Sequence, residues 1–159
     1  MPIDFKGLYE FHGHSCPMST IGARLGLAAM SALGVTKADQ FKIEAYYMAK
    51  NCALDGIQYV TGCTIGNGNF SYEDHGKAEL SLKKRDGSRC VNVSVSEDAM
   101  SKLARHRIRR AELMEEREIS GLARATEIDA EIKRDAETLV DWAQSAPDED
   151  MLEMMGCAI

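Results

Sequence analysis

The 159-residue sequence lacks long hydrophobic runs and any surplus of positive charge. Its apolar runs fall well short of the roughly 18 residues that a membrane-spanning helix needs. Its first residues, MPIDFKGLYEF, have neither the basic start nor the apolar segment of a signal peptide. The formal net charge of −6 argues against nucleic acid as a partner, because phosphate binding generally requires a basic surplus. We therefore expect a cytoplasmic protein with neither membrane nor nucleic-acid partners.

The cysteines are odd in number and show no paired spacing. Five cysteines at scattered positions argue against a disulfide framework, and a reducing cytoplasm would keep them as thiols. The glycine-rich GNGN segment does not match a phosphate-binding loop. With 45% apolar and 28% charged residues, the chain can form a hydrophobic core without disulfides, so metal or redox chemistry is the better use for some of the thiols.

The segment HGHSC places His12, His14 and Cys16 at every second position. On an extended strand these three side chains share one face, whereas on a helix His14 would point away from the other two. Pro17 favours the extended form, because a proline disfavours the helical region for the residue before it and suits the first turn of a following helix. We expect an extended arm with two imidazoles and a thiol, and a Cys16 thiolate favoured by the helix N-terminus.

The remaining pattern of the first 96 residues predicts an α+β fold. Apolar spacing predicts a helix over 20–33 closed by Gly34, a strand over 41–50, a short helix after Cys52 and a strand over 69–72. If Asp86 and Gly87 form a two-residue turn, the strands on either side pair so that their apolar residues share one face. The predicted pairs are Leu82 with Val91, Leu80 with Val93, Ala78 with Val95, and Cys90 with Lys83 on the polar face.

Residues 97–155 have the apolar periodicity of helices throughout, with a break near SGLARAT. We therefore divide the chain into an α+β metal-binding core over 1–96, built on an antiparallel sheet with packed helices, and a helical hairpin extension over 97–159. Two helices alone enclose little volume for their apolar stripes, so the extension predicts a homodimer in which these helices pack on a second subunit. Cys157 falls in a terminal segment to which we assign no role.

A second group of candidate residues follows the strand at 41–50. Cys63 lies in the loop TGCTIGNGN, and Cys52 and Asp55 lie at the start of the short helix before it. If the loop folds back towards the extended arm, His12, His14, Cys16 and Cys63 form one mixed site, with Cys52 as the substitute for any wrong ligand. Such a set suits a borderline-soft ion, zinc by default, with iron, nickel or cobalt as alternatives.

Each of these residues also has a purely structural interpretation. The two histidines could be a buried, hydrogen-bonded pair, Cys52 and Cys63 could be small core residues, and Asp55 could be a first-turn helix charge. His75 in EDHG is interpreted as a turn residue. The basic run at 105–110 is interpreted as a solvated helix face, because acidic residues follow it one turn later.

The segments FHGHSCP, GARLG, DGIQYVTGCTIGNGN and HGKAELSL together resemble the FmdE-like family, named after a component of formylmethanofuran dehydrogenase, over about residues 5–95. The resemblance implies an α+β core, a metal site built from the histidine and cysteine motifs, and a dimer. The family includes components or relatives of a molybdenum or tungsten enzyme that fixes carbon dioxide onto methanofuran. Asn67 stands where the family commonly has a lysine, and the chain ends in helices where some members have a cysteine-rich zinc finger.

Two functions of different class are consistent with this sequence. In the first, the protein is an accessory or carrier that holds a transition metal for a partner oxidoreductase. In the second, it is a small metalloenzyme with an open metal position, in which Cys52 or Asp55 acts as acid, base or nucleophile. A closed four-ligand site would favour the first function, and an exchangeable position facing a cleft would favour the second.

Overall fold

A five-stranded sheet forms the centre of the fold, with strand order β2-β1-β3-β4-β5. The computed structural model describes residues 2–157. The strands are β1 (Ile43–Tyr47), β2 (Phe70–Tyr72), β3 (Glu79–Lys84), β4 (Cys90–Val95) and β5 (Leu152–Gly156). The β1–β2 pair is parallel and the other three pairs are antiparallel, so the predicted α+β class with a mainly antiparallel sheet is confirmed.

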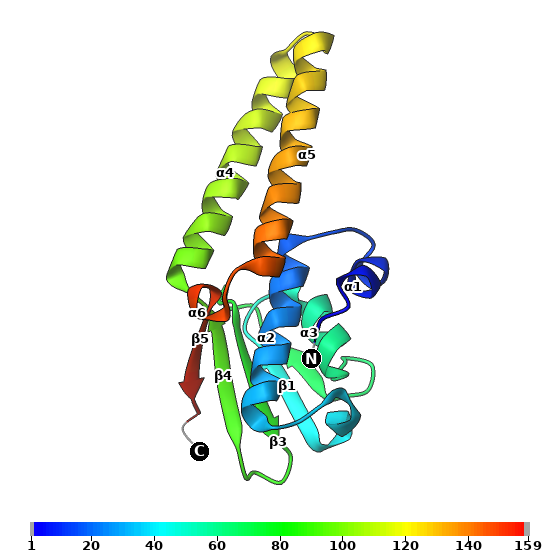
Figure 1. The fold of residues 1–159 in the computed structure, drawn as a ribbon, viewed down its shortest axis with the longest axis vertical. Helices are drawn as coiled ribbons and strands as arrows, with labels where there is room; N and C mark the ends of the chain where they lie inside the picture. Colours follow the sequence, from blue (N-terminus) through cyan, green and yellow to red (C-terminus); the bar gives the residue numbers. More distant parts are fainter. Residues whose placement is uncertain (1, 158–159) are drawn as a thin grey trace.

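Helices cover one face of this sheet and extend beyond one end of it (Figure 1). They are α1 (Phe5–His12), α2 (Pro17–Leu33), the 3-10 helix η1 (Lys37–Lys42), α3 (Ala53–Thr61), α4 (Glu97–Ile119), α5 (Leu122–Ser145) and α6 (Asp148–Met151). Helix α2 crosses the sheet, and α4 and α5 form a long hairpin that projects away from it (Figure 1). Within residues 2–157, no helix combines the length and the apolar character needed to span a membrane.

The β3–β4 hairpin has the predicted register. Leu82 lies opposite Val91 and Leu80 opposite Val93, while Lys83 lies opposite Cys90 on the more polar face. The turn contains Gly87 with a φ of 74°, a conformation that glycine adopts without strain. The apolar members of these pairs are buried beneath α2 in the main core. The alternation of apolar and polar residues therefore predicted the register of this hairpin correctly.

The main core joins one face of the sheet to α2 and α3. Its largest fully buried side chains are aliphatic, together with one tyrosine that contributes its ring: Ile21, Leu25, Leu33, Ile43, Tyr47, Ile57, Leu80 and Leu82. Helix α2 ends where predicted, at Gly34, which has a φ of 66° and donates its backbone N–H to Ser31 O over 3.1 Å. The core thus fixes α2 along its whole length, which positions the N-terminal end of α2 for the site described below.

The prediction of helix throughout 97–155 is correct up to α6 but wrong at the end. Residues 152–156 form β5, which pairs with β4, so the chain returns to the sheet after the helical hairpin. Helical periodicity could not detect a five-residue edge strand that follows two long helices. The return also gives Cys157 a role that the sequence did not indicate, because the pairing of Val91 with Gly156 brings Cys157 against Cys90, and the two form a disulfide. The expectation that all five cysteines are thiols is therefore wrong for this pair.

The α4–α5 hairpin is held by charges on its surface and by few buried side chains. Ion pairs connect the two helices from Arg109 to Glu131 and from Arg117 to Asp129. Between the two helices Leu113 and Ile128 are buried, with exposed fractions of 1% and 0%. The basic run at 105–110 lies mainly on solvent-exposed positions, as predicted.

Candidate metal centre

His12 reaches the site from the last position of a helix. Helix α1 ends at His12, and Gly13 follows with a φ of 94°, donating its backbone N–H to Tyr9 O over 2.8 Å. The expected extended arm is therefore wrong at its beginning, because α1 continues through His12 and the chain turns at Gly13. The imidazole of His12 is nevertheless directed inward, with only 8% of the side chain exposed.

Cys16 occupies the N-cap position of α2, as predicted. Its backbone is extended, with φ −142° and ψ 125°, and Pro17 provides the first turn of the helix. The carbonyl of Cys16 accepts hydrogen bonds from the hydroxyls of Ser19 (3.0 Å) and Thr20 (2.8 Å), which fixes the backbone at this point. The thiol is buried, with the residue 7% exposed.

Cys52 comes to the same place because α2 and α3 pack backbone to backbone. A Cβ atom added at Gly22 would overlap the backbone of Ala53, and one added at Gly56 would overlap the backbone carbonyl of Ser19. Only glycine permits this approach at both positions. The contact brings the N-terminal end of α3, preceded by Cys52, against the N-terminal end of α2, preceded by Cys16.

The ligand atoms of His12, Cys16 and Cys52 all lie within 4.8 Å of one another. The Nδ1 atom of His12 lies 2.7 Å from Oδ2 of Asp55. The opposite ring nitrogen, Nε2, is buried and has no hydrogen-bond partner among the described residues. A carboxylate that accepts a hydrogen bond from Nδ1 fixes the tautomer in which Nε2 presents a lone pair, which is the arrangement of many metal-binding histidines.

The electrostatics of the two thiols oppose simultaneous ionisation in the absence of a cation. Burial, together with the neighbouring Cys16 and Asp55, raises the pKa of Cys52 to about 11. A bound metal ion reverses this preference, because its positive charge favours the thiolate form of each ligand. Two thiols and an imidazole with a free, buried Nε2 therefore fit a borderline-soft transition metal.

The four predicted metal ligands occupy different environments. His12 and Cys16 converge, and the His14 ring lies 4.6 Å from the His12 ring, centroid to centroid, although His14 is exposed. The structure does not bring Cys63 to this group. Its thiol is fully buried and lies 3.9 Å from Gln40 O and 4.0 Å from Ile43 O.

The loop at 63–69 is closed on itself and does not fold back towards α1. Asn67 accepts a hydrogen bond from Thr64 N over 3.0 Å and donates one to Gly62 O over 2.9 Å. These bonds place the loop at the C-terminal end of α3, whereas Cys52 lies at its N-terminal end. This explains why Cys52, the substitute ligand and catalytic candidate of the sequence analysis, takes the place expected for Cys63.

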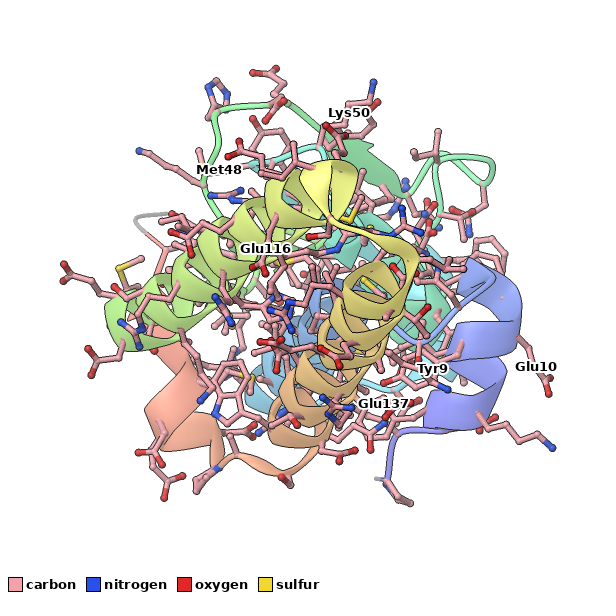
Figure 2. All side chains as sticks on the ribbon, turned by 90° about the horizontal axis from the view of Figure 1, so that it is seen from above. Tyr9, Glu10, Met48, Lys50, Glu116 and Glu137 are labelled. Atoms are coloured by element: carbon pink, nitrogen blue, oxygen red, sulfur yellow. A yellow bond between two sulfur atoms is a disulfide. The ribbon has the colours of Figure 1, made fainter. Side chains whose placement is uncertain are left out.

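A chain of hydrogen bonds that connects α5 to the Cys16 carbonyl was not predicted from the sequence. Tyr9 Oη lies 2.5 Å from Thr20 Oγ1 and accepts a hydrogen bond from Gln144 of α5 over 2.9 Å. Thr20 in turn donates to the Cys16 carbonyl. Figure 2 shows Tyr9 between α1 and α5. No local pattern marks these residues, because the contact between Tyr9 and Gln144 joins positions more than a hundred residues apart in the sequence.

Comparison with known proteins agrees with the resemblance found in the sequence. A family model described as "FmdE, Molybdenum formylmethanofuran dehydrogenase operon" matches residues 11–153. A "Probable S-adenosyl-L-methionine-binding protein" of Archaeoglobus fulgidus is 37% identical over 97 residues, which are 58% of this chain and 26% of that protein. The chain thus spans about a quarter of the length of this curated relative.

The fold also matches a solved structure. A tungsten formylmethanofuran dehydrogenase FmdE-like protein from Syntrophus aciditrophicus superposes with a TM-score of 0.61 over 97% of this chain and 70% of that chain. The sequence identity is 20%, so this likeness concerns the fold. Because the family model extends over both the His/Cys segment and the helical hairpin, the chain belongs to the FmdE family.

Proposed function

We propose that this protein binds one transition-metal ion through His12, Cys16 and Cys52 and serves as an accessory or carrier to a molybdenum- or tungsten-type oxidoreductase related to formylmethanofuran dehydrogenase. The observation that carries the metal site is the buried, unpartnered Nε2 of His12 beside two thiols. Leaving such a polar atom buried without a partner is unfavourable, and a metal ion would satisfy it. Zinc is the first candidate for this donor set, with iron, nickel and cobalt as alternatives.

The accessory role is supported by the family, whose description refers to a formylmethanofuran dehydrogenase operon. The cytoplasmic location expected from the sequence is part of the same proposal. The free thiols at Cys16 and Cys52 suit a reducing compartment, whereas the Cys90–Cys157 disulfide would have to persist there. In this function the protein delivers or retains the metal, and Asp55 holds the His12 ring in its binding orientation.

A stand-alone metalloenzyme is the second candidate. The observation that favours it is the number of clustered ligands, since His12, Cys16 and Cys52 leave one position of a tetrahedral ion for a water molecule or a substrate. In that function Asp55 would be placed to accept a proton, or Cys52 would act as a nucleophile instead of a ligand. His14, adjacent to His12, would close the fourth position and favour the carrier.

Metal analysis of purified variants tests the site. Protein prepared anaerobically without chelators should contain close to one metal equivalent per chain, and Cys16→Ser and Cys52→Ser should each lose most of it. Cys63→Ser is the matched control and should keep its metal, because its thiol faces backbone carbonyls elsewhere. Equal metal content in all three variants would reject the site, and loss only in Cys63→Ser would restore the ligand set expected from the sequence.

Cobalt substitution separates the two functional candidates. Cobalt(II) bound to thiolates absorbs through sulfur-to-metal charge transfer, and its ligand-field spectrum reports the coordination number. If the spectrum of the substituted protein changes with added cyanide or azide, the metal has an exchangeable position and the enzyme is favoured. If cyanide or azide changes the spectrum of His14→Ala but not that of the wild type, His14 completes a closed site, as the carrier function requires.

The homodimer remains part of this proposal. Among the described residues, the hairpin exposes large apolar side chains that no neighbouring element covers: Ile108, Met114, Ile119 and Leu122, exposed by 59%, 40%, 89% and 86%. We propose that the hairpins of two subunits pack on each other through these side chains and bury an area near the standard interface of about 1,600 Å². Such packing would place the helices of one subunit near the metal site of the other.

Light scattering tests the assembly. Wild-type protein at micromolar concentration should have a dimeric mass, and the double variant Ile119→Ser with Leu122→Ser should shift it towards the monomer. Arg134→Ser, an exposed change on α5, is the control. Deleting residues 97–159 is a poor test because it also removes β5 from the sheet. A monomeric wild type would reject the dimer.

A further inference from the structure

A cavity of about 440 Å³ lies between α4 and the loop that connects β1 to α3. This volume is within the range of small-molecule sites, which are commonly about 300–1,000 Å³. Its lining combines apolar side chains, including Met18 of α2 and Leu103 of α4, with two cationic residues, Lys50 and Arg107. Figure 2 shows Lys50 beyond α4, on the side away from α5.

The cavity is lined in part by sequence neighbours of the candidate metal ligands. Two of its lining residues, Met18 and Asn51, are two positions and one position away from Cys16 and Cys52 in the sequence. Asn51 is held in place by its side-chain oxygen, which accepts hydrogen bonds from Ala53 N (3.0 Å) and Tyr47 Oη (3.3 Å). A molecule in the cavity would therefore contact the residues that flank both thiols, on a rigid wall.

The charges that line the cavity favour a single negative charge in the ligand. Within the described chain, the side chains of Lys50 and Arg107 form neither an ion pair nor a hydrogen bond. The carboxylate of Asp74 also lines the cavity, but its Oδ1 already accepts the backbone N–H groups of Lys50 and Gly76, each over 3.3 Å. Two cations and one carboxylate leave one positive charge to be balanced.

The apolar side chains that line the cavity favour an aliphatic group in the uncharged part of the ligand. Leu103 and Ala104 belong to consecutive positions of α4, and both are only partly buried, so they present apolar surface that the protein itself does not cover. Covering this surface with an aliphatic group removes it from water, which favours binding in proportion to the area covered. The cavity therefore combines a cationic rim with an apolar wall.

We infer that this cavity binds a small organic monoanion, with its carboxylate at Lys50 and Arg107 and an aliphatic portion against Met18 and Leu103. The inference rests on the proposed function only in placing that anion beside a metal ion. Binding itself needs no metal, because the recognising groups are the two cations and the apolar wall. The anion would contact Met18 and Asn51, which are close in sequence to Cys16 and Cys52.

Hexanoate is a suitable probe, because it carries one carboxylate and a short aliphatic chain. Titrated into isotopically labelled full-length protein, it should shift the amide resonances of residues 49–51 and 100–107 in a saturable manner. Hexan-1-ol, which lacks the charge, and acetate, which lacks the chain, should each bind at least about fivefold more weakly, consistent with the contribution of one ion pair or a few buried methylenes.

Variants localise the binding. Arg107→Met should weaken hexanoate binding about fivefold, while Arg110→Met, an exposed change one turn away on α4, should leave it unchanged. Ala104→Leu should weaken hexanoate binding by occupying part of the cavity, and circular dichroism would check that the variant is folded. Equal effects of Arg107→Met and Arg110→Met, or equal binding of hexanoate and hexan-1-ol, would overturn the inference.

The same titration on apo protein and on protein loaded with zinc keeps the two proposals apart. Hexanoate binding in both forms supports the cavity whether or not the metal site is correct. Failure of hexanoate to bind protein that holds one metal equivalent would overturn the cavity inference and leave the metal site standing. If wild-type protein binds hexanoate but takes up no metal, the metal site is overturned and the cavity inference stands.

Discussion

The helix ends around the candidate metal centre and the α4–α5 hairpin are built in opposite ways. At this centre, α2 and α3 touch backbone to backbone through glycines, and of the candidate ligands Cys16 is buried while His12 and Cys52 are partly buried. In the hairpin, two longer helices are joined by exposed ion pairs and by few buried side chains. Precise placement in this protein therefore comes from small residues in close contact, whereas the hairpin tolerates looser packing.

The largest effect should come from Gly56→Ala, which tests the close contact. The added methyl group would overlap the Ser19 carbonyl and push α3 away from α2. Overpacking of this kind costs about 1–3 kcal/mol of unfolding free energy, and we expect the upper end of that range because the opposing atoms belong to the backbone. Chemical denaturation would measure the loss, and metal analysis should show reduced occupancy.

Gly121→Ala is the matched control in the hairpin. No atom lies within 4 Å of the added Cβ, and the backbone φ of −67° suits alanine. Its effect should stay below about 1 kcal/mol, because the only expected loss is the lower preference for alanine than for glycine at the N-cap of α5. Equal losses in Gly56→Ala and Gly121→Ala would show that the α2–α3 contact does not differ from the rest of the molecule.

Leu113→Ala should have the next largest effect and should act on the hairpin alone. Leu113 is 1% exposed and is among the few buried side chains between α4 and α5. Removing a buried leucine side chain costs about 2–5 kcal/mol in a well-packed core, and we expect the lower end here, since the hairpin can relax. Hydrogen exchange should accelerate in α4 and α5 while metal content stays unchanged. Accelerated exchange across α2 and α3 as well would show that the two regions unfold as one unit.

Asp55→Asn should weaken metal binding without affecting the fold. The asparagine keeps the size of the side chain but removes the charge that supports the His12 ring. Loss of such a supporting carboxylate commonly lowers metal affinity about 10–100-fold, which competition with a chelator would measure. Asp141→Asn, an exposed change on α5, is the control. An unchanged affinity in Asp55→Asn would show that Asp55 does not orient the ligand.

Arg117→Met should have the smallest effect, because both partners of its ion pair with Asp129 are exposed. The hydrogen bond from Arg117 lowers the pKa of Asp129 below its ordinary value of 3.8. Asp129 therefore contributes stability above pH 3.8, and this contribution is lost as the pH falls through the lower folded-state pKa. Denaturation in low and high salt, at neutral pH and at several pH values below 3.8, should show a small difference from wild type at neutral pH and low salt, which shrinks in high salt and as the pH falls.

The sequence predicted what depends on local pattern and missed what depends on distant contacts. The β3–β4 register and the N-terminus of α2 at Pro17 follow from alternation and from proline geometry, and the structure confirms both. The convergence of His12 and Cys16 was also expected, although α1 and a turn at Gly13, not an extended arm, produce it. Cys52 and Cys63 could not be distinguished, because the choice depends on which end of α3 faces the N-terminus of α2.

Strand β5 has a consequence for the order in which the protein forms during synthesis. Its partner β4 leaves the ribosome before α4 and α5, and β5 leaves after them. Until then β4 has an unpaired edge, to which another strand could add. Newly made chains are most exposed to misassembly in this interval, which includes the synthesis of both long helices. Rapid formation of the helical hairpin would shorten the interval by bringing residues 152–156 back to the sheet as soon as they emerge.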